Sequence, residues 1–291
     1  MSTSWYKSIT VGVDGSDESM SALDWAADAA VQHGARLTLV TTYDPPPTPG
    51  PELSTLVEDS RTEARHAALA AQNRLDGRHP RGLDFEVLVM RGAAAQVLAQ
   101  LSKTCDLVVV GRRGVGALDR ILLGSTSSAL AASAPGVVAV VPDGAATDAA
   151  RRIRVGVGRD DEPDVLGTAF AEAEARGCPL EVVHVLDTGP IASAMVGTYP
   201  SGVSSHEAAL SDVTDRISRW SEKYPRVGCT VVIRRRDPVG RLLHGLTPDD
   251  IVVVGGRPHP RIVGRVLRSV PDAVLRAAPC PVLVVHSRRQ G

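Results

Sequence analysis

The feature that most constrains this chain is an internal repeat. Asp106-Leu-Val-Val-Val-Gly111 returns as Asp250-Ile-Val-Val-Val-Gly255, so Gly255 lies 144 residues after Gly111. An Ala-Pro pair near an apolar run also occurs twice, and the two prolines are separated by the same 144 residues. We interpret the chain as a tandem duplication of one domain. The first domain is predicted over residues 1–143, a linker over 144–152 and the second domain over 153–291.

Within each copy, short apolar strands alternate with segments of helical periodicity. Such alternation predicts an α/β domain, a parallel sheet with helices on both faces. Because crossovers are right-handed, reversing the winding after the third strand gives the order 3-2-1-4-5 in a five-stranded sheet. The first copy has predicted strands at 8–13, 35–42, 84–90, 106–110 and 135–141, and helices at 17–33, 53–75, 93–103 and 125–134, the first two closed by Gly34 and Gly77. Matching strands in the second copy are predicted at 153–157, 179–185, 250–255 and 278–285.

Composition narrows the class of protein. Apolar residues make up 43% of the chain and aromatic residues only 3%, so Ala, Val, Leu and Ile must form the core. A net charge of −1 argues against a nucleic acid or a membrane surface as partner. The four cysteines form no Cys-x-x-Cys pair, which indicates a reducing cytosol and neither a disulfide framework nor a zinc site. The start of the chain lacks a signal peptide's apolar stretch, and no apolar run has the length of a membrane span. We therefore expect a soluble, cytoplasmic protein.

A glycine-rich stretch follows the fourth predicted strand. Gly111 ends that strand, Gly114 follows, and Gly124 stands directly before Ser125 and Thr126 at the start of a predicted helix. Glycines allow a ligand to approach the backbone closely, and the first amides of a helix attract an anion, above all a phosphate. Ser125 or Thr126 is expected to cap the helix. Each glycine alone is better explained by a plain turn, but the strand, loop and helix together favour nucleotide binding. The spacing matches neither a Walker A loop nor Gly-x-Gly-x-x-Gly.

The predicted topology brings a second segment to the same place. The winding reverses between the first and fourth strands, and α/β sheets bind ligands at the carboxyl ends of strands at such a switch point. Asp14 and Gly111 stand at those two ends. Two segments distant in sequence are thus expected to line one crevice.

These residues resemble the ATP-binding universal stress proteins. The Gly-x2-Gly-x9-Gly-Ser/Thr spacing of residues 111–125 and the first-strand segment Val11-Gly-Val-Asp-Gly-Ser16 carry the resemblance. It implies two tandem Rossmann-like, adenine-nucleotide α-hydrolase-like domains, an arrangement common in actinobacteria, and ATP, with or without Mg²⁺, as ligand. The ATP-binding residues implied are Gly12, Asp14, Thr42, Val110, Gly111, Arg113, Gly114, Gly116, Gly124, Ser125 and Thr126.

The resemblance also assigns roles to these residues. Asp14 would help to hold the nucleotide, with Gly12 beneath it, and the backbone at Thr42 would contact adenine. Val110, Gly111 and Gly114 fall on the ribose and phosphate loop, and Gly124, Ser125 and Thr126 fall on the phosphate grip. Arg113 and Gly116 lie within the loop and could reach phosphate oxygens. Two of these side chains have an alternative role that stays open: Asp14 as the N-cap of the first helix, and Arg113 as a solvated surface residue.

The second copy departs from this pattern. Gly158 stands in place of Asp14, Pro258 in place of Gly114, and Arg268 in place of Gly124, whereas Gly255 and Ser269 remain. Proline removes an N–H group, and a long side chain at Arg268 should block close approach of a phosphate. We therefore expect nucleotide to bind mainly to the first domain.

The function expected is that of a nucleotide-dependent regulator in stress or growth adaptation, without strong catalysis. No catalytic residue and no metal site is assigned. Two alternative functions stay open: a slow Mg-dependent ATPase or nucleotidyl-transfer enzyme, and an interaction module in which nucleotide is structural. The apolar fifth strands lie at predicted sheet edges, which invite pairing. The family resemblance implies that the two halves pair there, and that a homodimer forms through the fifth strands. The downstream protein partner is not identified by the sequence.

Overall fold

The computed structural model describes residues 5–44, 52–79, 83–114, 123–145, 150–158, 163–186, 205–235, 237–256 and 269–286. The first half of the chain forms β1 (Ser8–Gly12), α1 (Asp17–His33), β2 (Arg36–Tyr43), α2 (Glu52–Arg78), β3 (Phe85–Arg91), α3 (Ala94–Leu101), β4 (Leu107–Gly111), α4 (Ser125–Ser133) and β5 (Gly136–Val141). The second half forms β6 (Arg152–Val157), α5 (Pro163–Arg176), β7 (Leu180–Leu186), α7 (Ser205–Lys223), β8 (Cys229–Arg235), α8 (Pro238–Leu243), β9 (Asp250–Gly255), α9 (Val270–Ala277) and β10 (Val282–His286).

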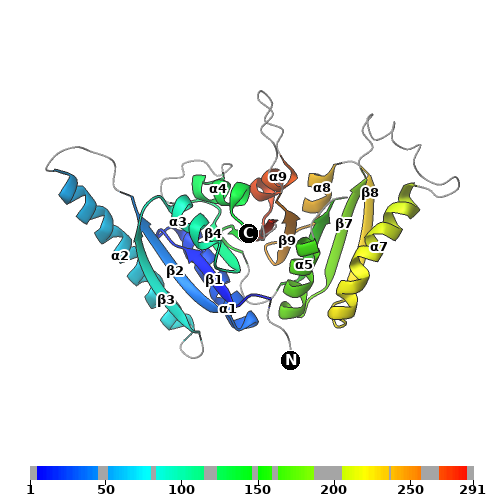
Figure 1. The fold of residues 1–291 in the computed structure, drawn as a ribbon, viewed down its shortest axis with the longest axis horizontal. Coiled ribbons are helices and arrows are strands. Elements are labelled where there is room, and N and C mark those ends of the chain that lie inside the picture. Colours follow the sequence, from blue (N-terminus) through cyan, green and yellow to red (C-terminus); the bar gives the residue numbers. More distant parts are fainter. Residues whose placement is uncertain are drawn as a thin grey trace, which may run out of the picture.

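All ten strands belong to one sheet, in the order β3-β2-β1-β4-β5-β10-β9-β6-β7-β8. Each half therefore has the predicted order 3-2-1-4-5, and its strands pair in parallel. Figure 1 shows the two halves on either side of a midline, with α4 and α9 next to it. The repeat in the sequence thus folds as a repeat in space.

The two halves join through their fifth strands. β5 and β10 pair antiparallel, with Val138 opposite Val284 and Val137 opposite Val285. Each fifth strand also pairs with the fourth strand of its own half, so both of its edges carry ladder hydrogen bonds. This corrects the expectation of a homodimer through the fifth strands: the partner of each one is the other half of the same chain, and neither edge is open to a second chain.

Local sequence explains most of the element boundaries, with three corrections. β10 starts at Val282 and not at residue 278, because Ala278 is the C-cap of α9. Gly34, at φ 62°, ends α1 as predicted, whereas Ser16 caps the helix, a role for which the sequence had offered Asp14. Gly77 does not end α2, because the helix continues to Arg78, whose guanidinium lies 3.1 Å from the Asp28 carboxylate on α1. β6 starts at Arg152, which the sequence placed in the linker, since this residue pairs in register with β9.

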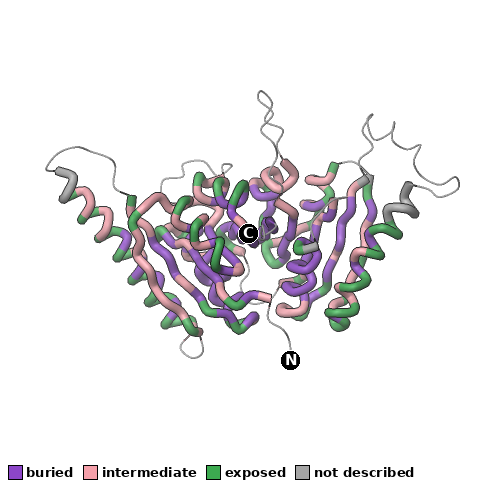
Figure 2. Tube along the Cα trace, in the orientation of Figure 1, coloured by how far each residue is buried: buried purple, intermediate pink, exposed green. Residues whose placement is uncertain are grey.

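Two apolar cores lie on opposite faces of the sheet. Trp25 of α1 and Phe170 of α5 are fully buried on one face, where α2 and α7 also pack. Leu98 of α3 and Leu130 of α4 are buried on the other face, where α8 and α9 also pack. Figure 2 shows buried residues along the central strands and exposed residues on the outer sides of α2 and α7. The sheet is thus covered on both faces, as the alternation of elements predicted.

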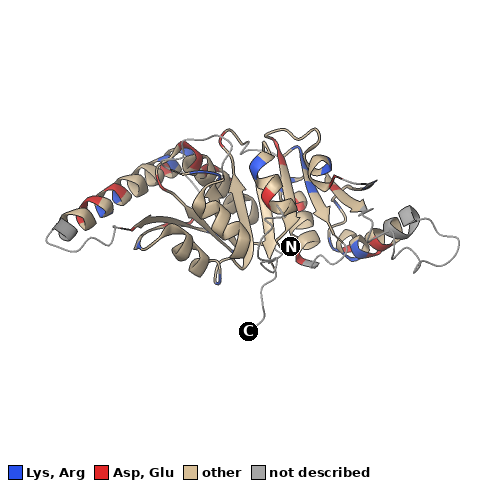
Figure 3. Cartoon of the chain, turned by 90° about the horizontal axis from the view of Figure 1, so that it is seen from above, with Lys and Arg blue, Asp and Glu red and all other residues tan. Residues whose placement is uncertain are grey.

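Charged residues of both signs alternate along the outer helices. On α2, acidic and basic residues follow one another along the helix, as the colours of Figure 3 show. Among the described helices, none is long and apolar enough to cross a membrane.

A buried charged cluster joins the halves between α1 and α5. The Arg176 Nε atom lies 2.9 Å from Glu172 Oε2, and His33 Nε2 lies 3.7 Å from Oε1. The guanidinium also lies 5.0 Å from the ring centre of Trp25. Burial alone would raise the pKa of the Glu172 carboxyl, but attraction from Arg176 and His33 outweighs it and lowers the pKa to about 2. Glu172 therefore stays ionised in a fully buried position.

Candidate functional site

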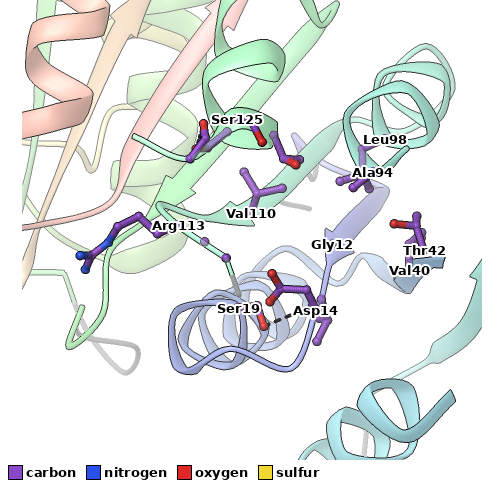
Figure 4. Close-up of a pocket in the computed structure, with 16 residues that line it drawn as sticks. Gly12, Asp14, Ser19, Val40, Thr42, Ala94, Leu98, Val110, Arg113 and Ser125 are labelled. Atoms are coloured by element: carbon purple, nitrogen blue, oxygen red, sulfur yellow. Dashed lines mark hydrogen bonds between the residues drawn. The ribbon is translucent and has the colours of Figure 1, made fainter. Parts of the chain in front are cut away.

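A cavity of about 350 Å³ opens in the first half at the carboxyl ends of β1 and β4. It lies between the loops that follow these strands, α3 and the start of α4, which is the switch point that the topology predicts (Figure 4). Its described lining is Gly12, Val13, Asp14, Ser19, Val40, Thr42, Ala94, Leu98, Val110, Gly111, Arg113, Gly114, Gly124, Ser125, Thr126 and Ser127. Ten of the eleven residues named from the sequence are in this set. The other, Gly116, lies outside the described residues.

The first turn of α4 is open toward the cavity. Gly124 occupies the N-cap position, and no side chain accepts a hydrogen bond there. The expectation that Ser125 or Thr126 caps the helix is wrong, because α4 already begins at Ser125. The Ser127 hydroxyl turns back and donates to Arg112 O at 2.8 Å. Amides of the first helical turn are therefore left for a ligand, and the helix dipole favours an anionic one.

Two glycines let the loops around this turn approach closely. A Cβ atom at Gly124 would lie 3.1 Å from Arg112 O and 3.3 Å from Ser127 Oγ. A Cβ atom at Gly114 would lie 2.2 Å from Asp14 Oδ2, so the loop or the Asp14 side chain would have to shift. The loop after β4 thus packs directly on the carboxylate that follows β1.

Asp14 faces the cavity and does not cap α1. Its Oδ1 atom accepts hydrogen bonds from Ser16 N at 3.0 Å and Ser16 Oγ at 2.6 Å. The cap of α1 is Ser16, whose Oγ accepts from Ser19 N at 3.2 Å. Figure 4 shows the carboxylate turned toward the centre of the site, with the backbone N–H of Asp14 bonded to Ser19 Oγ. Ser16 therefore orients the carboxylate, which lines the cavity.

The Arg113 side chain forms an ion pair with the buried carboxylate of Glu18. Its Nε atom lies 2.7 Å from Glu18 Oε1, its backbone N lies 2.5 Å from Oε2, and its Nη2 also contacts Oε1. Glu18 is only 6% exposed. The Arg113 guanidinium points away from the centre of the site in Figure 4, so this pair anchors the loop to α1. Gly111 allows that approach, because a Cβ atom there would lie 2.9 Å from the Glu18 backbone.

The opposite end of the cavity is apolar and was missed from the sequence. Val40 comes from β2, while Ala94 and Leu98 come from α3, and these side chains lie together beside Thr42 in Figure 4. Gly12 permits this packing, because its Cβ would lie 2.7 Å from Leu98 Cδ1. Val13, Ser19 and Ser127 were missed as well. The available signal was the four-residue spacing of Ala94 and Leu98, which places both on one face of a helix that follows the third strand.

The corresponding helix of the second half is closed. Ser269 caps α9, and its Oγ accepts from Asp272 N at 3.3 Å. Pro271 contributes no N–H in the first turn, and the Asp272 carboxylate there bonds Arg276. A helix start with a cap and a carboxylate is a poor site for an anion. The departures predicted at Pro258 and Arg268 lie outside the described residues.

The loop after β6 also differs from its counterpart in the first half. Arg216 of α7 donates through Nη1 to Gly158 O at 2.8 Å, where the first half presents Asp14. The adjacent His184 ring contacts Val157 O through Nδ1 at 2.8 Å. In the described residues, no group of His, Cys, Asp or Glu side chains has an arrangement that could hold a metal ion.

The different caps give a paired prediction. Replacing Ser269 by Ala is expected to lower the free energy of unfolding by about 1 kcal/mol, because it removes a helix cap. Replacing Ser125 by Ala should change it by less than about 0.5 kcal/mol, because this hydroxyl does not cap α4. Denaturant unfolding of both variants measures the difference, and equal costs would contradict the assignment of the caps.

The comparisons with known proteins agree with the duplicated fold. The model of the universal stress protein family matches residues 6–142 and again residues 149–286. A universal stress protein of Mycolicibacterium smegmatis (strain ATCC 700084 / mc(2)155) is 36% identical over 291 residues, which cover 96% of this chain and 97% of that protein. A universal stress protein of Mycobacterium tuberculosis (strain ATCC 25618 / H37Rv) is 33% identical over 289 residues, with 96% of each chain covered.

A solved structure shares the complete architecture. The crystal structure of a universal stress protein from Archaeoglobus fulgidus DSM 4304 superposes with a TM-score of 0.70 at 17% sequence identity, and covers 97% of this chain and 99% of its own. At this identity the likeness concerns the fold. Together with the two matches to the family model, it shows that the chain belongs to the universal stress protein family and carries two of its domains in tandem.

Proposed function

We propose that this protein binds ATP in its first half and acts as a nucleotide-dependent regulator in stress or growth adaptation. The observation that carries the proposal is the polarity of the cavity. One end is the uncapped start of α4, with the Ser125 and Thr126 hydroxyls beside it, and the other end is apolar, with Val40 and Leu98. Phosphates suit the first end and a purine base suits the second.

The residues present fit an adenine nucleotide. Amides and hydroxyls of the first turn of α4 would hold the phosphates, and the small Gly124 would let them approach. Asp14 would bind the ribose hydroxyls or a Mg²⁺ ion on the phosphates, since its carboxylate faces the cavity. The Arg113 guanidinium has no part in this proposal beyond holding the loop through Glu18.

Regulation without strong catalysis is favoured by the described lining. Asp14 is its one carboxylate, and this lining holds no histidine, lysine or cysteine that could serve as a base or nucleophile. The same carboxylate is the observation that favours slow Mg-dependent ATP hydrolysis as a second candidate. All four cysteines are described and none forms a disulfide, which supports a reducing compartment such as the cytoplasm.

Calorimetric titration with ATP and Mg²⁺ tests the proposal. We expect one ATP to bind per chain, because α9 begins with a capped turn while α4 does not. Cyclic AMP should bind more weakly than ATP, since its single phosphate is tied to the ribose and it lacks the β- and γ-phosphates that would extend toward α4. Phosphate release in the same samples measures hydrolysis and is expected to be negligible. No binding would refute the proposed function, and two equivalent sites would refute the assignment to the first half.

A further inference from the structure

The backbone of Arg112 sets the position of the open turn of α4. This residue directly follows β4, and its N–H donates to Val141 O at 2.9 Å. Its carbonyl accepts from Gly124 N at 2.9 Å and from Ser127 Oγ at 2.8 Å. Gly124 and Ser127 both line the cavity. A displacement of Arg112 would therefore move the turn at which the phosphates are proposed to bind.

The side chain of Arg112 crosses to the second half. Its Nη2 donates to the carbonyl oxygen of Ala278, the residue that ends α9. Ala278 is fully buried, and the Nε atom of Arg112 has no hydrogen-bond acceptor among the described residues. The guanidinium is partly buried, which lowers its pKa, and hydrogen bonds are stronger in surroundings of lower polarity.

The second half does not return this contact. The residue at the corresponding position, 144 residues later, is Gly256. Its N–H bonds Val285 O at 2.7 Å, as Arg112 bonds Val141, but a Cβ atom there would lie 2.3 Å from the His286 ring. The His286 ring of the second half instead contacts the first half: its Nε2 lies 3.0 Å from the carbonyl oxygen of Ala131 in α4. Each contact therefore joins the second half to a part of the first half beside the cavity, either Arg112 or α4.

We propose that the second half positions the nucleotide site of the first half through Arg112, which is a positioning residue for the start of α4. This inference rests on the proposed ATP site. Because coupling between two sites is reciprocal, a contact that favours nucleotide binding is itself strengthened when nucleotide binds. Binding of nucleotide in the cavity is therefore expected to strengthen the contact at the end of α9 in the second half.

Hydrogen exchange on the unmodified full-length chain is the first test. Addition of ATP and Mg²⁺ is expected to slow exchange at the end of α9 and the start of β10, residues 274–283, as well as around α4. The outer strand β8 should not change. If ATP binds and protects α4 but leaves residues 274–283 unchanged, the inference is refuted while the proposed function stands. If ATP does not bind at all, both fall.

The variant Arg112→Met is the second test, because it keeps the length of the side chain and removes its charge and donors. We expect ATP to bind about tenfold more weakly and the protection of residues 274–283 to be lost. Arg216→Met is the matched control, since it also removes a guanidinium bond to a backbone carbonyl, but far from the cavity. Equal ATP affinity in Arg112→Met and the unmodified chain would refute the inference. A loss of stability alone, with affinity retained, would assign Arg112 a purely structural role.

Discussion

The variant Gly124→Arg is expected to abolish the rise in melting temperature that ATP causes. A ligand that binds only the folded state at a concentration 100 times its Kd stabilises that state by about 2.7 kcal/mol. For a chain of this size, this corresponds to a shift of roughly 4–5 °C in the unmodified protein. The variant should show no shift, because its side chain would occupy the space in front of the open turn of α4.

The geometry around Gly124 supports a large effect. Even a Cβ atom at this position would lie 3.1 Å from Arg112 O, so the longer side chain must extend toward the cavity or displace the loop. The second half has Arg268 at the corresponding position. The substitution therefore introduces into the first half a residue that the second half already carries.

A matched control distinguishes blockage of the cavity from the effect of the added positive charge. Gly77 lies inside α2, and nothing lies within 4 Å of the place where its Cβ would be. Gly77→Arg adds the same charge and should leave the shift produced by ATP intact. An undiminished shift in Gly124→Arg, measured by differential scanning calorimetry, would show that ATP binds elsewhere.

The variant Glu172→Ala is expected to lower the free energy of unfolding by about 3–5 kcal/mol, because it leaves a buried cation without its partner. The Arg176 side chain is only 2% exposed and has Glu172 as its ion-pair partner. His33 on α1 loses the same carboxylate, so the contact between the halves is weakened as well.

The same carboxylate makes stability depend on pH. The folded pKa of Glu172 is about 2, and the ordinary value is 4.5. Because the folded value lies below the unfolded one, the stabilisation is complete above about pH 4.5 and is lost as the pH falls toward 2. Denaturant unfolding between pH 7 and pH 3 should therefore show the difference between the unmodified chain and Glu172→Ala shrinking as the pH falls.

The control is an exposed glutamate with a similar arginine neighbour. Glu58 on α2 lies 3.8 Å from Arg61, and its side chain is 64% exposed. Glu58→Ala should change stability little at any pH, since exposed ion pairs contribute little. A cost for Glu172→Ala no larger than that of the control would mean that the buried cluster does not hold the halves together.

The fold was largely predictable because its signals are local or repeated. Apolar strands, helix stops such as Gly34 and the 144-residue repeat indicate the order of the elements without reference to distant contacts. The errors arose where a distant partner decided the outcome. Gly77 fails to end α2 because Arg78 reaches Asp28 on another helix, and the fifth strands are closed because each finds the other.

The site was predictable in its polar part and less so in its apolar part. Asp14 and the glycines could be recognised by residue type and spacing. Val40 and Leu98 cannot be distinguished from other core residues until α3 is placed against β1. The pairing of Arg113 with Glu18 joins residues that are 95 positions apart, and no local pattern signals it. The coupling through Arg112 depends on the junction of the halves, which the sequence indicated only in outline.

The antiparallel junction of β5 and β10 has a consequence for how such a molecule can evolve. In a symmetric dimer of identical chains, every contact across the axis occurs twice, and a change on one side is imposed on the other. Here a covalent connection keeps the partners together at high effective concentration, and each side of the axis is encoded separately. The Arg112 side chain can therefore cross the axis, while the corresponding residue of the second half, Gly256, has no side chain to do so. A fused chain can therefore carry different side chains, and so different functions, on the two sides of the axis, which a dimer of identical subunits cannot do.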